Sequence, residues 1–286
     1  TSDTISMFST HFFINLAINL LLLGGFAYLI RKKNLLSYFS GGRWWLTWLS
    51  IAIITLMDEL TSIFYAPSEA FRFIGTSAIV FIAVTSLLMR ILSARMVEIA
   101  EILELHGVRG GGVYSFSYIV LGPSMSFIAV ASIIVDYVLT ASISTVSAVE
   151  NGMTFFNIGA TGKFIFEIGI VWFVAGLNIL GIKENAKFTF GIFVIAAIVL
   201  INLLTQGILH TTPHGWQTAG ASFVSVFQNF EGKNIFSMYF LVIVSVSSCI
   251  LAYSGIESVV QTAGLVKSWK DVKKAYIFLA LTTGIF

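Results

Sequence analysis

The sequence predicts an all-α integral membrane protein with several spans. Hydrophobic residues make up 57% of its 286 residues and charged residues only 10%, whereas soluble domains carry about 25% charged residues. The mean hydropathy is +0.92, and apolar runs long enough to cross a bilayer recur along the chain. A water-soluble protein is therefore not expected. A net charge of +2, without a basic run interleaved with aromatics, argues against a nucleic-acid binder.

Seven full spans and the beginning of an eighth are expected from the apolar runs. They cover 12–30, 45–66, 73–93, 118–148, 163–182, 188–207 and 236–264, and the eighth begins at 275. The eighth run is shorter than the roughly 20 residues that one crossing needs, so we expect a fragment of a longer protein. The two longest runs exceed one crossing, which predicts tilted or broken helices.

The positions of Lys and Arg predict the orientation of the chain. If the first span enters from outside, all but three of the 16 basic residues lie on the cytoplasmic side, as the positive-inside rule favours. The cytoplasmic set is Arg31, Lys32, Lys33, Arg43, Arg90, Arg95, Arg109, Lys183, Lys187, Lys267, Lys270, Lys273 and Lys274, and the outer set is Arg72, Lys163 and Lys233. Trp44, Trp45 and Trp48 fit an aromatic belt at the inner start of the second span. We expect a multi-pass protein of the plasma (inner) membrane with its N-terminus outside.

Two polar segments differ from the spans around them. Glu98, Glu101 and Glu104 recur every three residues between apolar positions, which predicts an amphipathic cytoplasmic extension of the third span, broken by the glycines at 110–112. Segment 208–234 is polar and is expected to be an outer loop.

Neither histidines nor cysteine predict a metal centre. His210 and His214 are four residues apart, but Pro213 lies between them and no third ligand is evident, so loop histidines are expected. Cys249 is the only cysteine and lies in an apolar run, where a small buried side chain is the usual role.

Acidic residues inside the apolar runs are the strongest functional signal, because ionisable groups at membrane depth are costly and often mark a path for ions or substrates. They are Asp58, Glu59, Asp136, Glu167 and Glu257. Asp136, Thr140 and Ser144 are spaced four apart and form one polar stripe on a helix. Oxygen ligands of this kind suit a hard, weakly hydrated cation or a proton. Helix packing and positions near an interface remain alternative explanations.

The second and seventh spans carry signs of interruption. Asp58 and Tyr65 are seven apart and share a helix face, while Glu59 points about 100° away. Tyr253, Ser254 and Gly255 precede Glu257 inside a long apolar run and predict a break there. Interrupted helices are typical of the midplane sites of transporters.

These residues make the chain resemble the amino acid–polyamine–organocation (APC) transporter superfamily. The stretches that carry the resemblance are DELTSIFYA, GGGVYSFSY, VDYVLTASIS and YSGIES. The resemblance implies a LeuT-like fold of two inverted five-helix repeats, with discontinuous helices in spans 2 and 7. It divides the chain into an extra transmembrane helix and basic loop (1–43), the first repeat (44–207), an extracellular loop (208–234) and the truncated start of the second repeat (235–286). Such a fragment is not expected to transport by itself.

Within the superfamily the chain is similar to KimA-type, proton-coupled potassium importers. The resemblance implies an ion-binding set of Asp58, Tyr65, Asp136, Tyr137, Thr140, Ser144 and Ser254, with Glu257 and Asp136 coupling the proton. The chain departs from that group at Met57 and Glu59, which stand where glycines flank the aspartate, and at Ser254, which stands for threonine.

We therefore expect a secondary-active transporter, not an enzyme, that imports a small cation such as K⁺ by proton symport. An amino acid or polyamine permease of the same fold, and a sensor or assembly subunit that has lost transport, are the alternatives. The residues 55–66 lack the glycine run with which amino acid permeases bind a carboxylate. No cofactor is expected; the coupling ion is H⁺, with Na⁺ as the alternative. The expected partners are the lipid bilayer and the solute, with a homodimer left open.

Overall fold

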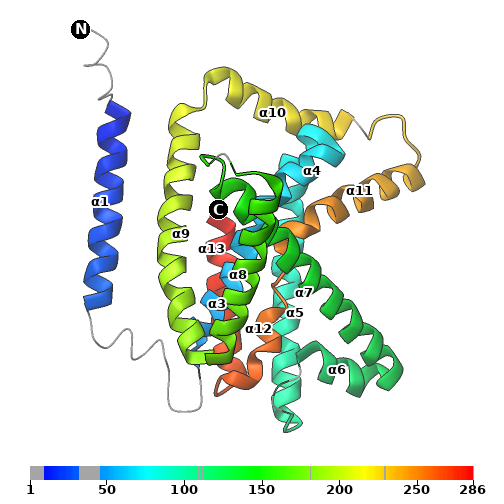
Figure 1. The fold of residues 1–286 in the computed structure, drawn as a ribbon. Coiled ribbons are helices and arrows are strands. Elements are labelled where there is room, and N and C mark those ends of the chain that lie inside the picture. The colour runs from blue at the N-terminus through cyan, green and yellow to red at the C-terminus, as the bar shows by residue number, and fades with distance from the viewer. Residues whose placement is uncertain are drawn as a thin grey trace, which may run out of the picture.

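The computed structural model describes residues 10–31, 46–108, 110, 112–156, 158–180, 182–228 and 230–285, and in these residues every regular element is helical. The α-helices of Figure 1 are α1 (Thr10–Arg31), α3 (Trp48–Ser62), α4 (Ala66–Ile74), α5 (Ala78–Leu105), α6 (Gly112–Leu121), α7 (Pro123–Gly152), α8 (Ala160–Leu180), α9 (Ile182–His210), α10 (Pro213–Gln228), α11 (Ile235–Ile250), α12 (Ser258–Gln261) and α13 (Trp269–Ile285). Short 3₁₀ turns cover Gly75–Ser77, Leu251–Tyr253 and Ala263–Leu265.

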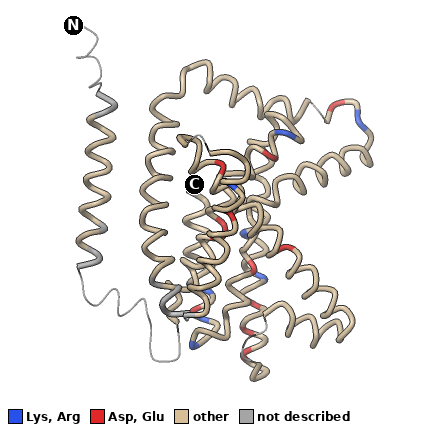
Figure 2. The backbone as a smooth tube through the Cα atoms, in the orientation of Figure 1, with Lys and Arg blue, Asp and Glu red and all other residues tan. Residues whose placement is uncertain are grey.

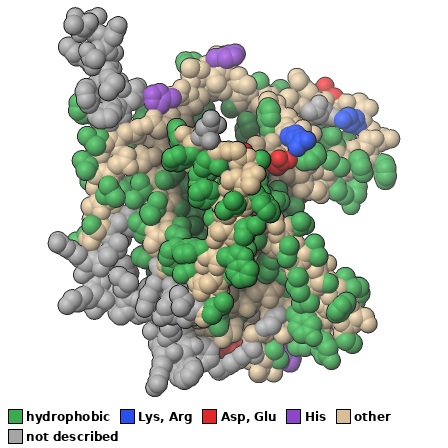
Figure 3. Space-filling model, in the orientation of Figure 1, with side chains coloured by type: hydrophobic (Ala, Val, Ile, Leu, Met, Phe, Trp, Pro, Cys, Tyr) green, Lys and Arg blue, Asp and Glu red, His purple; other side chains and the backbone are tan. Residues whose placement is uncertain are grey.

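Five segments in the described part are long and apolar enough to cross a membrane. They are Ala66–Leu105, Pro123–Gly152, Ala160–Ile179, Phe188–His210 and Ile235–Tyr253, and shorter apolar helices lie at Phe13–Gly25 and Gly112–Leu121. None of the residues of Ala160–Ile179 is buried, and apolar side chains cover much of the visible face of the molecule (Figure 3). Figure 2 shows that the long helices carry few charged residues along their length. Exposed apolar surface of this extent fits lipid rather than water.

The core of the molecule surrounds α3, which packs against α9, α12 and α13. Ile51 and Leu56 of α3 are fully buried and belong to one cluster with Val260 of α12 and with Val272 and Leu279 of α13. Thr47 caps the start of α3, because its hydroxyl accepts a hydrogen bond from the amide of Ser50 at 3.3 Å. Of the two acidic residues near the end of α3, Glu59 is buried and Asp58 is half-buried.

Helix α1 is attached to α9 through a reciprocal pair of amides. Asn19 donates to Asn202 Oδ1 at 3.0 Å, and Asn202 donates back to Asn19 Oδ1 at 2.6 Å. Paired amides of this kind hold helices together at membrane depth, where no water competes for them. The two helices lie side by side in Figure 1.

Glycines end or divide two of the predicted helices. The amphipathic extension of the third span is present, since α5 continues to Leu105, but it ends before the glycines at 110–112. Gly107 adopts φ +72°, and the next amide, of Val108, donates to Leu103 O at 2.9 Å, as at many helix C-termini. The long run 118–148 is likewise not one helix, because Gly122, at φ +84°, separates α6 from α7 just before Pro123.

Segment 208–234 is largely helical rather than a loop, so that prediction was wrong in its secondary structure. Helix α9 ends at His210, and α10 begins at Pro213, a residue favoured in the first turn of a helix. Thr212 caps α10, because its hydroxyl accepts from the amide of Gly215 at 3.2 Å. His214 therefore lies in the first turn of α10. Because the segment is polar, this helix was not predicted. Its start is stabilised by a cap that depends on one hydroxyl.

Several Lys, Arg and Trp residues from which the orientation was predicted lie outside the described residues. These are Lys32, Lys33, Arg43, Arg109, Trp44 and Trp45.

Candidate functional site

The second predicted span is interrupted where its sequence changes from apolar to turn-forming. Helix α3 ends at Ser62, and α4 begins at Ala66 with Pro67 in its first turn. Proline has no amide hydrogen and its ring crowds the preceding turn, so a helix cannot run through residues 63–67 without strain. The amide of Tyr65 donates to Ser62 O at 3.2 Å, so the chain between the helices forms tight turns.

The seventh predicted span is interrupted at Ser254 and Gly255. Gly255 adopts φ +99°, a conformation that side chains disfavour, and a Cβ atom there would overlap the carboxylate of Asp58. The break is therefore packed directly against α3. Tyr276 of α13 donates to Ile256 O at 3.0 Å, which fixes the residues after the break.

Helix α7 carries the polar stripe that contacts both interruptions. The hydroxyls of Thr140 and Ser254 are hydrogen-bonded at 3.2 Å, and Ser254 also donates to Asp136 Oδ2 at 3.5 Å. Further along α7, Ser144 donates to Thr61 Oγ1 of α3 at 3.3 Å. The predicted stripe thus connects one broken helix to the other.

A cavity of about 320 Å³ lies where these three elements meet. Its lining residues are Asp58, Thr61, Tyr137, Thr140, Ala141, Ser144 and Ser258. Six of these seven side chains present an oxygen atom, and the described lining includes no Lys, Arg or His. The cavity can therefore surround a small positively charged solute with oxygen atoms.

The electrostatic environment of the cavity is negative. The carboxylates of Glu257 and Asp136 both act on Asp58 by Coulomb repulsion, although neither lines the cavity. Their proximity is unfavourable unless a cation, a proton or a nearby basic group compensates them.

Some of the predicted site residues line the cavity and others do not. Asp58, Tyr137, Thr140 and Ser144 line the cavity, and Asp136 and Ser254 are hydrogen-bonded to each other at its edge. Tyr65 does not line it: its side chain is buried and its hydroxyl is paired with that of Ser62 at 3.1 Å. Glu257 lies just before α12, where it interacts with Asp136 and Tyr137.

Three cavity residues were not in the predicted site: Ala141 and two that carry hydroxyls, Thr61 and Ser258. Thr61 follows Asp58 by three residues, and its hydroxyl is directed back to Asp58 O at 2.7 Å. Ser258 lies 3.4 Å from the hydroxyl of Tyr137. Helical spacing from Asp58 would have indicated Thr61, because residues three apart share a face. Nothing in the sequence alone pairs Ser258 with Tyr137, because this contact depends on the break at Gly255.

Comparison with known families gives a match, and comparison with curated proteins and with solved structures gives none. The matching family is described as amino acid permease, and its model covers residues 42–286. This range contains both interrupted helices and the whole cavity. The matched range is also most of the chain. The chain therefore belongs to the amino acid permease family, of the APC superfamily, and is a multi-pass membrane transporter of that type.

Proposed function

We propose that this protein imports a small monovalent cation, K⁺ in the first place, by proton symport. The observation that carries the proposal is the oxygen-lined cavity between two interrupted helices, with Asp58 in its wall and no basic side chain in its described lining. Interrupted helices that meet at one site are typical of secondary transporters with inverted repeats. We place the site in such a LeuT-like fold, in the plasma membrane with the N-terminus outside.

The amides at the first break support a cation over an amino acid. A permease that binds a substrate carboxylate there needs free amide hydrogens. Here the amides of Ile63 and Phe64 donate to Leu60 O and Thr61 O at 3.3 and 3.2 Å, and that of Tyr65 is bonded as described above. A substrate carboxylate would also meet the negative field of Asp58.

A polyamine or amino acid permease is the second candidate, because the cavity has room for more than one dehydrated ion. About 320 Å³ would hold part of an aliphatic amine, and carboxylates suit ammonium groups. A membrane sensor that has lost transport is the third candidate.

Uptake into proteoliposomes separates these candidates. The full-length protein is reconstituted, and influx of radioactive rubidium is measured with an inward proton gradient, against spermidine and a panel of amino acids. We expect rubidium uptake that acidifies the lumen, read with a trapped pH-sensitive dye. Uptake of an amino acid or of spermidine without rubidium would refute the proposal, and no uptake of any solute would favour the sensor.

Two variants then test the site. Asp58→Asn and Asp136→Asn keep the size of each side chain and remove its charge, and each is expected to lower rubidium uptake at least tenfold, since a charged hydrogen-bond partner is worth about 1.5–3 kcal/mol. Glu98→Gln is the matched control, because Glu98 is exposed and paired with Arg95 at 2.7 Å. Uptake that survives both aspartate changes would contradict the proposed ion path.

A further inference from the structure

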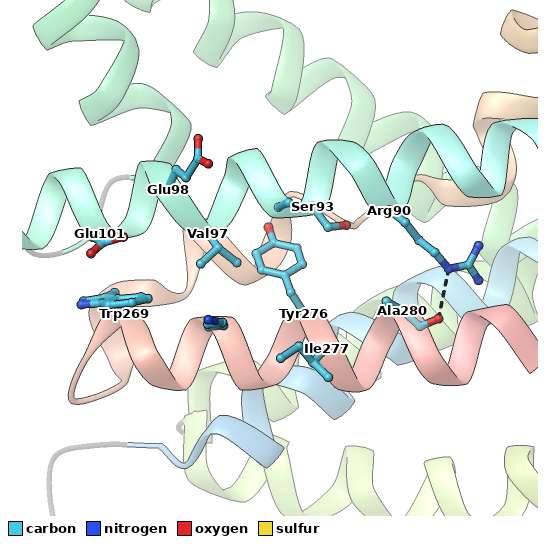
Figure 4. Close-up of a pocket in the computed structure, with 11 residues that line it drawn as sticks. Arg90, Ser93, Val97, Glu98, Glu101, Trp269, Tyr276, Ile277 and Ala280 are labelled. Atoms are coloured by element: carbon cyan, nitrogen blue, oxygen red, sulfur yellow. Dashed lines mark hydrogen bonds between the residues drawn. The ribbon is translucent and has the colours of Figure 1, made fainter.

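A second cavity lies between α5 and α13 and shares no lining residue with the cavity at Asp58. Figure 4 shows Arg90 at one end of it, Glu101 and Trp269 at the other end, and Tyr276 between them. Arg90 and Glu101 both belong to α5, and the helix between them is roughly 16 Å long. The cavity measures about 380 Å³, a size typical of sites for small molecules.

This cavity has a buried floor and an exposed apolar rim. Ser93 and Tyr276 line it and are only 6% and 3% exposed. Their hydroxyls donate to main-chain carbonyl oxygens at 2.8 and 3.0 Å, so the floor has no free hydroxyl hydrogen. Ala94 and Ile277 lie at the rim and are exposed. The cavity therefore opens onto the apolar surface that faces lipid.

The cavity crosses the predicted ends of two spans. The third predicted span ends at residue 93 and the eighth begins at 275, so Arg90 lies within a span, whereas Glu101 and Lys273 lie beyond the span ends. Trp269, whose amphipathic ring is of the kind that gathers at membrane interfaces, lines the polar end. One end of the cavity is therefore at the depth of acyl chains and the other at the depth of headgroups, on the side that the predicted orientation makes cytoplasmic.

Two of the four charged side chains in the cavity already have partners within the protein. Arg90 donates to Ala280 O of α13 at 3.2 Å and to the hydroxyl of Ser86, so it joins the two helices. Glu98 accepts from Arg95 at 2.7 Å on the exposed face of α5. These two charges are therefore accounted for without a ligand.

The other two charged side chains, Lys273 and Glu101, have no such partners. Among the described residues, neither side chain takes part in an ion pair or a hydrogen bond, with each other or with a third group. The neighbouring Lys274, by contrast, is paired with Asp271 at 3.7 Å and does not line the cavity. The polar end thus offers one ammonium group and one carboxylate beside an apolar wall.

We propose that this cavity binds phosphatidylethanolamine, a phospholipid whose headgroup carries both a phosphate and a primary ammonium group. The phosphate pairs with Lys273, the ammonium donates to Glu101, and an acyl chain follows the apolar rim at Ala94 and Ile277. Pockets with basic groups between membrane helices on the cytoplasmic side are typical binding sites for lipid headgroups. The proposal goes beyond the transport function and holds whichever solute is carried.

The charges of the cavity favour this lipid over the two common alternatives. The quaternary ammonium of phosphatidylcholine has no hydrogen to donate to Glu101, and charge-assisted hydrogen bonds are the strong ones. Phosphatidylglycerol has no cationic group, so its phosphate would pair with Lys273 and leave Glu101 without a partner.

Native mass spectrometry of the full-length protein in detergent tests the proposal, with the three lipids carrying the same acyl chains. We expect the Kd for phosphatidylethanolamine to be about tenfold lower than for the other two, as for the gain of one charge-assisted hydrogen bond. Lys273→Gln and Glu101→Gln should each raise this Kd about tenfold. Lys274→Gln is the matched control and should leave it unchanged, because Lys274 lies outside the cavity.

A third variant tests the location without changing any charge. Ala94→Trp places a large ring in the cavity and should abolish the preference for phosphatidylethanolamine, and it serves as the test if a charge variant does not fold. Equal affinity for the three lipids, tighter binding of phosphatidylglycerol, or a preference that survives Ala94→Trp or both charge variants would overturn the proposal. So would an absence of lipid binding, as when another segment of the chain fills the cavity. Rubidium uptake plays no part in this readout, so failure of the proposed transport and failure of the lipid site are separate results.

Discussion

Gly255→Ala should both strain the backbone and displace Asp58, and the two effects can be measured separately. Gly255 has φ +99°, and an alanine Cβ would overlap the carboxylate of Asp58. A left-handed backbone conformation costs an L-residue about 1–2 kcal/mol. The overlap adds to this cost, because the carboxylate of Asp58 lies directly against the break. Asp58 must therefore move, and displacement of a binding group by about 1 Å can cost up to 10²-fold.

Gly232→Ala is the matched control for this prediction. Gly232 has φ +72°, but a Cβ atom there would meet no atom within 4 Å. Both variants should lose about 1–2 kcal/mol of stability, read as lower thermal unfolding temperatures in detergent. Only Gly255→Ala should raise the KM for rubidium, by roughly tenfold or more. Equal KM values in the two variants would show that Asp58 is not positioned by the break, and the reasoning would fail.

Three further changes test the packing around the site. Thr140→Val keeps the shape of the side chain but removes the hydroxyl that bonds Ser254 at 3.2 Å; rubidium KM should rise by about fivefold, as for the loss of about 1 kcal/mol, and an unchanged KM would exclude this contact from the site. Asn202→Leu leaves Asn19 of α1 without its partner on α9. A disulfide engineered between α1 and α9 should then form less efficiently, because about 1–2 kcal/mol of interhelical hydrogen bonding is lost. Equal disulfide yield in the variant and the wild type would contradict the amide pairing. Thr212→Ala removes the cap of α10 and should lower stability by about 1 kcal/mol, visible in thermal unfolding but not in KM.

The sequence was most informative where one element carries the whole signal. The stripe of Asp136, Thr140 and Ser144 follows from helical spacing alone, and the structure places it between the two interruptions. Pro67 and Gly255 indicate the two interruptions, because each restricts or relaxes the backbone conformation at its own position. Such features can be predicted because they do not depend on which other helix lies nearby.

Features that depend on tertiary contacts were missed. Ser258 reaches Tyr137 only because the chain turns at Gly255. Tyr65 shares a helical face with Asp58 in an ideal helix, but α3 ends at Ser62 and the tyrosine leaves that face. Arg90 was assigned to the cytoplasmic side by the positive-inside rule, but its bonds to Ala280 O and to the hydroxyl of Ser86 could not be predicted, because the first depends on the packing of α13 against α5.

Helix α7 is joined to each broken helix by a pair of hydroxyls, Thr140 with Ser254 and Ser144 with Thr61, in addition to the bond from Ser254 to Asp136. A hydroxyl can donate or accept, and a water molecule can replace either partner with little loss of enthalpy. Each wall of the cavity is therefore attached to the same rigid helix by a contact that hydration can exchange. Water that replaced one partner would loosen that contact and leave the other hydroxyl pair in place.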